Sequence, residues 1–303
     1  MKPKIIFHCG APKTGSTSFQ HLLYANREAL LKAGIHFPDV SRKKRVADDL
    51  RILLSRLSLK PGKVQDKQIR KARKVIEQTL AENKAHTLLV SHESILGAPF
   101  GTGKKSIYPK AARKVPAIAK ALEGYDVEVR FFVRDYAGFI PSWYVQQVRM
   151  GRTQTFEDFC KRHHATSFSF LPLIAILRAN FGEDRVQVFD HADLVADSHA
   201  TLSKSFPEIM AALGDAGRDQ PRKNRTIGGG MVAAYRRWNR MAARLPGSRK
   251  VREGIRHFGR RYVLLPLERF SNSPKIAFEP SVAKSLSERF RAELPGMLGS
   301  GPG

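Results

Sequence analysis

The first forty residues show the clearest arrangement of apolar and polar positions. Residues 4–9 (KIIFHC) form a short apolar run bounded by Gly10 and Pro12, which is typical of a buried strand. Residues 16–33 place apolar side chains at helical spacing, and Gly34 stands where a glycine commonly ends a helix. A strand, a glycine-containing turn and a helix in this order predict the start of an α/β fold.

The same alternation continues along the chain. Short apolar runs predict further strands over residues 86–90, 127–133 and 186–189. Helical spacing predicts helices over residues 111–122, 156–161, 170–180 and 231–243, and one that follows Asp135 and ends at Met150. Strands that alternate with helices favour a parallel sheet flanked by helices with right-handed crossovers, so we expect a single α/β domain over residues 1–303.

Two strongly basic segments interrupt this alternation. Residues 41–85 are predicted to be a basic helical insertion, with two amphipathic helices separated by a Pro-Gly pair. Residues 217–303 are predicted to be a basic, mostly helical C-terminal segment whose tail, residues 296–303, is frayed. The pattern leaves open whether the basic residues form ordinary solvated faces or a surface that meets a substrate.

The composition is that of a folded protein, but the charge is unusual. Hydrophobic residues make up 42% of the chain and charged residues 26%, which excludes a disordered chain. Lys and Arg number 53 against 27 for Asp and Glu, giving a formal net charge of +26. Such an excess predicts an anionic partner: a nucleotide, an acidic glycan, a membrane surface or nucleic acid.

The cellular location follows from segments that are missing. No apolar run approaches the roughly 18–20 residues of a membrane helix, and the apolar stretch 5–7 is too short for a signal peptide. Cys9 and Cys160 are the only cysteines, which excludes a disulfide framework or a cysteine zinc site. His163 and His164 have no partner at metal-ligand spacing, so we assign no metal. These features predict a cytoplasmic protein.

The segment from Gly10 to Thr17 (GAPKTGST) is the sharpest chemical signal. It follows a predicted strand and opens a predicted helix, where backbone N–H groups converge on an anion. Gly10, Gly15 and Thr17 fit the triphosphate-binding pattern GxxxxGK[ST]. The lysine position of that pattern holds Ser16, however, and the lysine is Lys13. The segment is a candidate phosphate cradle, and the alternative is an ordinary turn.

The carboxylate of a magnesium-dependent kinase is missing from its usual place. In such enzymes a second strand leads to an aspartate that helps to hold magnesium. Here the predicted strand 86–90 leads into Ser91, His92 and Glu93. A P-loop kinase of a small metabolite therefore lacks two of its parts and is the second interpretation.

The order Pro12-Lys13-Thr14-Gly15-Ser16-Thr17 resembles the 5′-phosphosulfate loop of sulfotransferases that use 3′-phosphoadenylyl sulfate (PAPS). A second motif of that family is a strand ending in an arginine, with a serine about eight residues later. Residues 131–135 (FFVRD) and Ser142 are similar to it. Residues 33–38 and 156–159 also resemble the bacterial branch of the family.

The resemblance, which covers approximately residues 4–213, implies that the loop binds PAPS as co-substrate and that no metal is needed. The implied cofactor-binding loop consists of Pro12, Lys13, Thr14, Gly15, Ser16 and Thr17. Lys13 would also be catalytic, because its charge would meet the negative charge that grows on the leaving oxygen. The hydroxyl groups of the loop would donate to the 5′-phosphate.

Other parts of PAPS have candidate ligands outside the loop. Arg134 and Ser142 would hold the 3′-phosphate, since a guanidinium offers a planar fork to phosphate oxygens. Arg225 precedes three glycines and loosely resembles a late loop that covers the nucleotide in relatives. Arg134 as an ordinary surface arginine and Arg225 as part of a solvated linker are the alternatives.

A general base would assist the attack of an acceptor hydroxyl on sulfur. Glu93 and His92 are the candidates, because ligand groups of open α/β sheets gather at the ends of strands. The resemblance makes Glu93 the first candidate and His92 the second, since bacterial relatives carry a similar Ser-x-Glu after this strand. Either residue is alternatively a loop residue that caps the next segment. The resemblance implies a hydroxyl acceptor on a carbohydrate or glycolipid.

A third interpretation is a basic nucleic-acid-binding protein, motivated by the charge of +26. The chain has no zinc-finger spacing and no aromatic signature of an RNA-recognition motif, so nucleic acid is disfavoured as a partner. A peripheral contact with an anionic membrane surface, such as the inner face of the cell membrane, stays open.

Overall fold

The computed structural model describes residues 2–38, 50–101, 108–218, 227–268 and 273–299. The chain forms two compact units. The sheet unit comprises Met1–Arg134, Ser169–Arg222 and Arg291–Gly303, and the helical unit comprises Asp135–Phe168 and Lys223–Phe290. The predicted insertion, residues 41–85, belongs to the sheet unit, and most of the predicted C-terminal segment belongs to the helical unit. A single domain over the whole chain stays a prediction.

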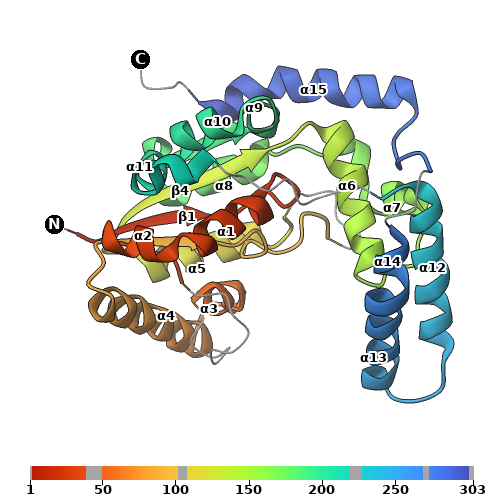
Figure 1. The fold of residues 1–303 in the computed structure, drawn as a ribbon, viewed down its shortest axis with the longest axis horizontal. Coiled ribbons are helices and arrows are strands. Elements are labelled where there is room, and N and C mark those ends of the chain that lie inside the picture. The colour runs from red at the N-terminus through yellow and green to blue at the C-terminus, as the bar shows by residue number, and fades with distance from the viewer. Residues whose placement is uncertain (1, 39–49, 102–107, 219–226, 269–272, 300–303) are drawn as a thin grey trace. The chain divides into compact units, whose positions relative to one another are not determined.

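The sheet unit is built on five parallel strands in the order β2-β3-β1-β4-β5. The strands are β1 (Lys4–His8), β2 (Ile35–His36), β3 (Thr87–Ser91), β4 (Asp126–Val133) and β5 (Val186–Asp190). Four of them confirm the predicted strands to within a residue, and with the flanking helices they confirm the predicted α/β class (Figure 1). The edge strand β2 was not predicted, because two residues are too few to show a pattern.

Nine helices of the sheet unit are described. They are α1 (Ser16–Ala25), α2 (Arg27–Lys32), α3 (Leu50–Ser55), α4 (Lys63–Glu82), α5 (Ala111–Leu122), α8 (Leu171–Phe181), α9 (His191–Ala196), α10 (Ser198–Ser205) and α11 (Pro207–Leu213). The two amphipathic helices predicted in the insertion are α3 and α4, which confirms that part of the prediction.

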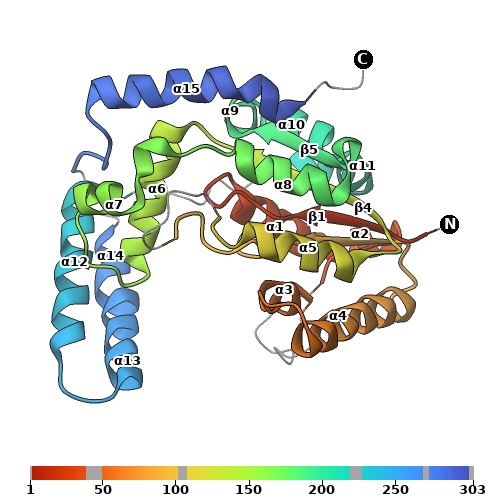
Figure 2. The same cartoon turned by 180° about the vertical axis from the view of Figure 1, so that it is seen from behind.

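The central strands send alternate side chains to opposite faces of the sheet. Ile6 and Phe132 project to one face, where they join apolar residues of α1, α2, α10 and α11 in a buried cluster. Phe7 and Phe131 project to the other face, and the ring centroid of Phe7 lies 6.1 Å from that of Phe181 in α8. Helices therefore cover both faces, which is the arrangement that a parallel sheet requires (Figure 2).

One predicted helix is broken in two. The helix expected over residues 16–33 ends at Ala25, and α2 begins at Arg27. Asn26 between them has φ −111° and ψ 19°, and its side-chain amide donates to the carbonyl of Leu22 at 2.9 Å. The prediction of one continuous helix was wrong because the side chain of Asn26 caps the end of the first.

The end of the chain also differs from expectation. Helix α15 (Pro280–Leu298) continues through Gly296, where a frayed tail was expected. Within the sheet unit the guanidinium of Arg178 donates to the carbonyls of Gly296 and Met297 at 3.0 and 2.8 Å, and Met297 is fully buried. A side chain of α8 therefore holds the last turn of α15. The local sequence pattern around residue 296 cannot predict this contact, because Arg178 is distant in the sequence.

The helical unit consists of α6, α7, α12, α13 and α14 and the beginning of α15. Their bounds are α6 (Tyr136–Arg149), α7 (Phe156–His163), α12 (Gly229–Arg244), α13 (Arg249–Gly259) and α14 (Leu265–Leu267), with a π-helical segment, η5 (Arg260–Leu264), between the last two. Arg149 forms two hydrogen bonds with the carboxylate of Glu268, at 3.1 and 2.6 Å, and the hydroxyl of Tyr235 donates to the same carboxylate at 2.8 Å. Asn239 of α12 donates to the carbonyls of Val148 and Arg152.

Four charged side chains form a compact group in the sheet unit. The ammonium of Lys4 lies 2.8 Å from a carboxylate oxygen of Glu128 and 2.8 Å from one of Glu208. Arg130 also pairs with Glu128, and it donates to the carbonyl of Ser205 at 2.7 Å. Burial alone would raise the pKa of Glu128, but Lys4 and Arg130 more than offset it and hold that pKa below its usual value. We call these four residues the charge group.

Candidate functional site

The candidate loop, residues 10–15, begins where β1 ends at the centre of the sheet. In the sheet, β3 and β2 lie on one side of β1 and β4 and β5 on the other, so the order in which strands are added reverses at β1. Crevices at such a reversal, beyond the carboxyl ends of the strands, are where open α/β sheets bind ligands. The loop therefore occupies the position at which this fold places a binding site.

Backbone hydrogen bonds fix the start of the loop against β4. The N–H of Ala11 donates to the carbonyl of Phe132 at 2.9 Å, and the N–H of Phe132 donates to the carbonyl of Gly10 at 2.8 Å. The hydroxyl of Thr14 donates to the carbonyl of Ala11 at 2.5 Å. The Thr14 hydroxyl thus closes the loop on itself and is not directed outward as a donor, whereas its backbone N–H remains available.

Two backbone conformations bend the loop into helix α1. Lys13 and Gly15 have φ values of 71° and 85°, in the left-handed region. A methyl group on Gly15 would lie 2.9 Å from Cδ2 of Leu194, a residue of α9. The left-handed backbone therefore favours glycine here, and a larger residue would also have to displace the Leu194 side chain.

The loop presents a series of backbone donors. Among the described residues, the N–H groups of Thr14, Gly15, Ser16 and Thr17 have no protein acceptor, while those of Ser18 and Phe19 donate to the carbonyl of Gly15. The first N–H groups of a helix lack partners within the helix, and together with the helix dipole they attract an anion. This arrangement fits the predicted phosphate cradle.

Glu93 contacts the loop directly. The hydroxyl of Ser16 donates to Oε2 of Glu93 at 2.9 Å, and Ser16 is buried while Glu93 is half-buried. Gln20 of α1 donates to the carbonyl of Ser91 at 3.2 Å, which ties the first helix to the end of β3. The first candidate base is therefore held beside the predicted phosphate cradle.

The ring of His92, the second candidate base, is held by a hydrogen bond from a neighbouring backbone N–H group. Its backbone N–H donates to the carbonyl of His8, and its Nδ1 accepts a hydrogen bond from the N–H of Ser94 at 3.1 Å. A neutral imidazole that accepts at Nδ1 carries its proton on Nε2. The outer nitrogen of His92 is then a donor, which favours Glu93 over His92 as the group that takes a proton.

Arg134 lies on the other side of the loop. Its guanidinium donates to the carbonyl of Lys13 at 2.7 Å, and its side chain is half-buried at the end of β4. Glu93 and Arg134 therefore contact the loop from β3 and β4, the two neighbours of β1. Ser142 is a half-buried residue of α6 in the helical unit, and its pairing with Arg134 stays a prediction. Arg225 lies outside the described residues.

Two residues near the loop were missed by the sequence analysis. Tyr108 has 1% of its surface exposed, and its hydroxyl has no hydrogen-bond partner among the described residues. A methyl group on Gly10 would lie 3.5 Å from this hydroxyl oxygen. Burial, followed by nearby Cys9 and Glu93, raises the pKa of Tyr108, so the phenol is a neutral donor beside the loop.

His191 is the second missed residue, at the start of α9 directly after β5. Burial, and then the positive charge of Arg134, lower the pKa of His191 to about 4. The imidazole is therefore neutral at physiological pH. Its position after the last strand was a signal in the sequence, because strand ends in a parallel sheet share one edge. Tyr108 had no such signal, since it follows a glycine-rich stretch without periodicity.

The described residues hold no group of three or more His, Cys, Asp or Glu side chains placed to bind a metal ion. No helix in the described ranges combines the length and the apolar character that a bilayer-spanning segment needs. Both Cys9, which is buried, and Cys160 have free thiols.

A comparison with solved structures finds a sulfotransferase from Alicyclobacillus acidocaldarius. The similarity covers 85% of this chain and 96% of that one, with a TM-score of 0.40 and 15% sequence identity. No family model matches the chain, and no curated protein matches its sequence.

Proposed function

We propose that this protein is a PAPS-dependent sulfotransferase that transfers a sulfuryl group to a hydroxyl of a carbohydrate or glycolipid. The observation that carries the proposal is the loop after β1. Its N–H groups at residues 14–17 lack protein acceptors among the described residues, and it lies between the carboxylate of Glu93 and the guanidinium of Arg134. A nucleotide with two separate anionic groups and a hydroxyl nucleophile need these groups: hydrogen-bond donors for an anion, a cation and a base.

The residues at the loop fit the phosphosulfate end of PAPS. The N–H groups of residues 14–17 supply donors for the 5′-phosphate, and Lys13 supplies a positive charge in the same turn. Tyr108 adds a buried phenol whose hydrogen has no acceptor in the described structure. A buried donor without a partner is costly, so a bound oxygen atom would satisfy it. Arg134 would bind the 3′-phosphate.

The transfer itself is a displacement at sulfur. The acceptor oxygen attacks the sulfur atom while the bond from sulfur to the bridging oxygen breaks, and that oxygen leaves with the electron pair as part of adenosine 3′,5′-bisphosphate. The hydroxyl proton passes to the Glu93 carboxylate, which the Ser16 hydroxyl orients. Lys13 stabilises the charge on the leaving oxygen, and this interaction is stronger in the transition state than in the ground state.

A P-loop kinase is the second candidate, and one contact favours it. The hydrogen bond from Ser16 to Glu93 brings a carboxylate to the loop, near where a kinase would hold magnesium. Thr17 also occupies the hydroxyl position of the triphosphate pattern. Against this candidate, the lysine that follows the second glycine in a kinase is absent, because Gly15 is followed by Ser16.

Thermal unfolding with a set of nucleotides tests the proposal. A ligand that binds only the folded state raises the unfolding temperature by mass action. Adenosine 3′,5′-bisphosphate should raise it without magnesium, and AMP at the same concentration should raise it less. Release of adenosine 3′,5′-bisphosphate from PAPS should then depend on an added glycan or glycolipid acceptor.

The same measurement identifies the competing function. Stabilisation by ATP with magnesium, together with none by the bisphosphate, would contradict the sulfotransferase and support the kinase. A variant that tests the site itself is Arg134→Ala, which should reduce the difference between the bisphosphate and AMP. Arg27→Ala, at an exposed arginine of α2, is the matched control and should leave that difference unchanged.

A further inference from the structure

The outer side of α13 and of the segment after it carries large apolar side chains in contact with solvent. Val251, Phe258 and Tyr262 expose 51%, 60% and 60% of their surfaces. Val251, Ile255 and Phe258 are separated by intervals of four and three residues, which places them on one side of the helix. The rings of Phe258 and Tyr262 lie 4.8 Å apart between centroids, so η5 continues this apolar stripe. Val263, Leu265 and Leu267 add further exposed apolar surface.

A different side of α13 packs against α12, so the stripe is not needed to hold the two helices together. A methyl group on Gly259 would lie 1.9 Å from Cζ2 of Trp238, which shows how closely this side approaches α12. The indole N–H of Trp238 donates to the carbonyl of Arg256 at 3.3 Å. In Figures 1 and 2 the two helices run side by side, joined by a short turn. We call α12, α13 and η5 the basic hairpin.

The same hairpin concentrates positive charge. Residues 237–261 contain nine Lys and Arg residues and a single acidic residue, Glu253, which pairs with Arg249 at 2.8 Å. The nine are Arg237, Arg240, Arg244, Arg249, Lys250, Arg252, Arg256, Arg260 and Arg261. The apolar stripe is therefore surrounded by cations with almost no acidic counterpart.

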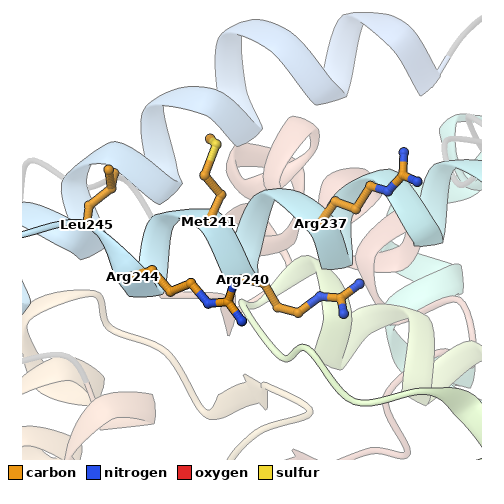
Figure 3. Close-up of a pocket in the computed structure, with 5 residues that line it drawn as sticks. All are labelled: Arg237, Arg240, Met241, Arg244 and Leu245. Atoms are coloured by element: carbon orange, nitrogen blue, oxygen red, sulfur yellow. The ribbon is translucent and has the colours of Figure 1, made fainter.

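An open cavity of about 400 Å³ on helix α12 also combines positively charged and apolar side chains. It is lined by Arg237, Arg240 and Arg244 together with Met241 and Leu245 (Figure 3). Arg237 and Met241 extend to one side of the helix and Arg240 and Arg244 to the other, and 48% of the Met241 surface is exposed. Guanidinium groups next to an apolar side chain suit a ligand with anionic head groups and hydrocarbon beneath them.

We propose that the basic hairpin is a membrane-binding surface that docks on a bilayer containing anionic lipids. Exposed aromatic and aliphatic side chains on one side of a helix, bordered by Lys and Arg, are the composition of a helix that lies in the plane of the membrane interface. Phe258, Tyr262 and Val251 enter the boundary between head groups and acyl chains. The arginines of α12 and α13 bind lipid phosphates.

The charge and the exposed apolar side chains of the hairpin favour a bilayer over two other partners. A second copy of the chain would bring two strongly cationic hairpins together without acidic partners, which is unfavourable. A nucleic acid would satisfy the arginines but would leave Val251, Phe258 and Leu265 in water. An anionic bilayer satisfies both kinds of side chain. The inference is independent of the proposed sulfotransferase activity, since it uses none of the residues at the loop.

Co-sedimentation of the full-length protein with vesicles tests the inference. The vesicles are phosphatidylcholine alone and phosphatidylcholine with phosphatidylserine, each at low and at physiological salt. Binding should occur on the anionic vesicles and weaken with salt. No binding to phosphatidylserine vesicles would overturn the inference.

Two variants of the hairpin separate its apolar and electrostatic parts. Phe258→Ser with Tyr262→Ser should reduce the partition coefficient at least about tenfold, because two exposed rings no longer enter the interface. Arg237→Gln with Arg240→Gln and Arg244→Gln should reduce it about 100-fold, because each cation near an anionic surface strengthens binding about fivefold. All five side chains are exposed, so the fold should be retained, which far-ultraviolet circular dichroism checks.

Helix α4 provides matched controls. Its Val64 is 67% exposed, and its Lys67, Arg70 and Lys74 are exposed cations at similar spacing. Val64→Ser, and separately Lys67→Gln with Arg70→Gln and Lys74→Gln, should leave vesicle binding nearly unchanged. An equal loss from the α4 triple variant would mean that net charge alone drives adsorption, and would overturn the assignment to the hairpin.

The other occupants give distinct outcomes. Light scattering after gel filtration should show the same molar mass for the wild type and for the Phe258→Ser with Tyr262→Ser variant. A dimer that this variant dissociates would identify a second copy as the occupant and overturn the inference. Binding to phosphatidylserine vesicles that the apolar variant leaves unchanged would also overturn it, because the rings would then contribute nothing.

Discussion

Two buried tyrosines differ in what their hydroxyl groups contact. The hydroxyl of Tyr235 donates to Glu268 at 2.8 Å, whereas that of Tyr108 has no partner among the described residues. Each residue exposes 1% of its surface. A buried polar group without a partner costs free energy in the folded state, so the Tyr108 hydroxyl is not expected to stabilise the free protein.

Removing each hydroxyl should therefore change stability in opposite directions. Tyr108→Phe should raise the free energy of unfolding by about 1 kcal/mol, because it removes an unsatisfied hydroxyl without changing the ring. Tyr235→Phe should lower it by roughly 1.5–3 kcal/mol, because it removes a hydrogen bond to a carboxylate. Denaturant titration of both variants without nucleotide measures the difference. A loss of stability in Tyr108→Phe would show that its hydroxyl is satisfied in the free protein.

Substitutions of Lys13 and Arg134 should change different kinetic constants. Lys13 is proposed to meet charge that grows during the reaction, so Lys13→Ala should lower kcat by at least about 100-fold while KM for PAPS changes less. Arg134 is proposed to bind a 3′-phosphate that is present throughout, so Arg134→Ala should mainly raise that KM, by about 10- to 100-fold. Steady-state kinetics with PAPS and an accepted glycan measure both constants.

The hydrogen bond from Arg134 to the carbonyl of Lys13 requires a control, because Arg134→Ala also removes a support of the loop. Arg134→Lys keeps the charge and should retain part of the preference for adenosine 3′,5′-bisphosphate over AMP. If Arg134→Ala leaves the ratio of these two affinities unchanged, Arg134 does not bind the 3′-phosphate.

At the scale of elements, the sequence predicted those parts of the fold that are local. The strands at 4–8, 87–91 and 126–133 and helix α5 appear as short apolar runs or clear helical spacing, and the structure confirms them. The edge strand β2 and the last turn of α15 depend instead on contacts with distant residues. Local periodicity contains no information about such contacts.

The candidate site also has a part that the local sequence predicts and a part that depends on contacts between distant residues. The loop after β1 was predictable because the glycines and the strand–helix order lie within a few residues of one another. Tyr108 was missed because it lies beside Gly10 only through the arrangement of the sheet, and His191 was missed although its position after the last strand was a signal. The contact between Ser16 and Glu93 joins residues that are 77 positions apart, and only the pairing of β1 with β3 brings them together.

His8 links β1 to β3 and should make the stability of the sheet unit depend on pH. Its Nδ1 lies 2.8 Å from the Ser91 hydroxyl, its ring is enclosed by phenylalanines, and burial lowers its pKa to about 4. The unfolded chain, with a histidine pKa of about 6.5, binds the proton first as pH falls. The contribution of His8 to the free energy of unfolding should therefore be complete above about pH 6.5. It should fall by on the order of 3 kcal/mol as the pH falls toward 4.

Denaturant titrations between pH 7 and pH 4 measure this dependence. His8→Asn should flatten it, although His191, whose pKa is also lowered to about 4, contributes in the same direction. His21→Asn, at an exposed position in α1, is the matched control and should retain the slope of the wild type. An unchanged slope in His8→Asn would show that another group dominates acid unfolding.

At the scale of the whole molecule, a net charge of +26 acts at a distance. Positive potential steers anionic reactants toward a protein, and salt screens this steering. If the acceptor is acidic, kcat/KM for the acceptor should fall as salt rises from low to physiological, and more steeply than the affinity for PAPS falls. An uncharged glycan of the same size is the control, and equal salt dependence for the two acceptors would leave the charge without a role in acceptor capture.

The charge group has a consequence for how this chain can change during evolution. Arg130 exposes 2% of its surface, and losing either Glu128 or Glu208 would leave the two cations of the group, Lys4 and Arg130, with one carboxylate between them. A substitution at one of the four positions is therefore expected to be tolerated only with compensation at another. In homologues of this protein, Lys4, Glu128, Arg130 and Glu208 should be kept together or replaced together. The four positions should therefore covary, although they lie on three different elements of the fold.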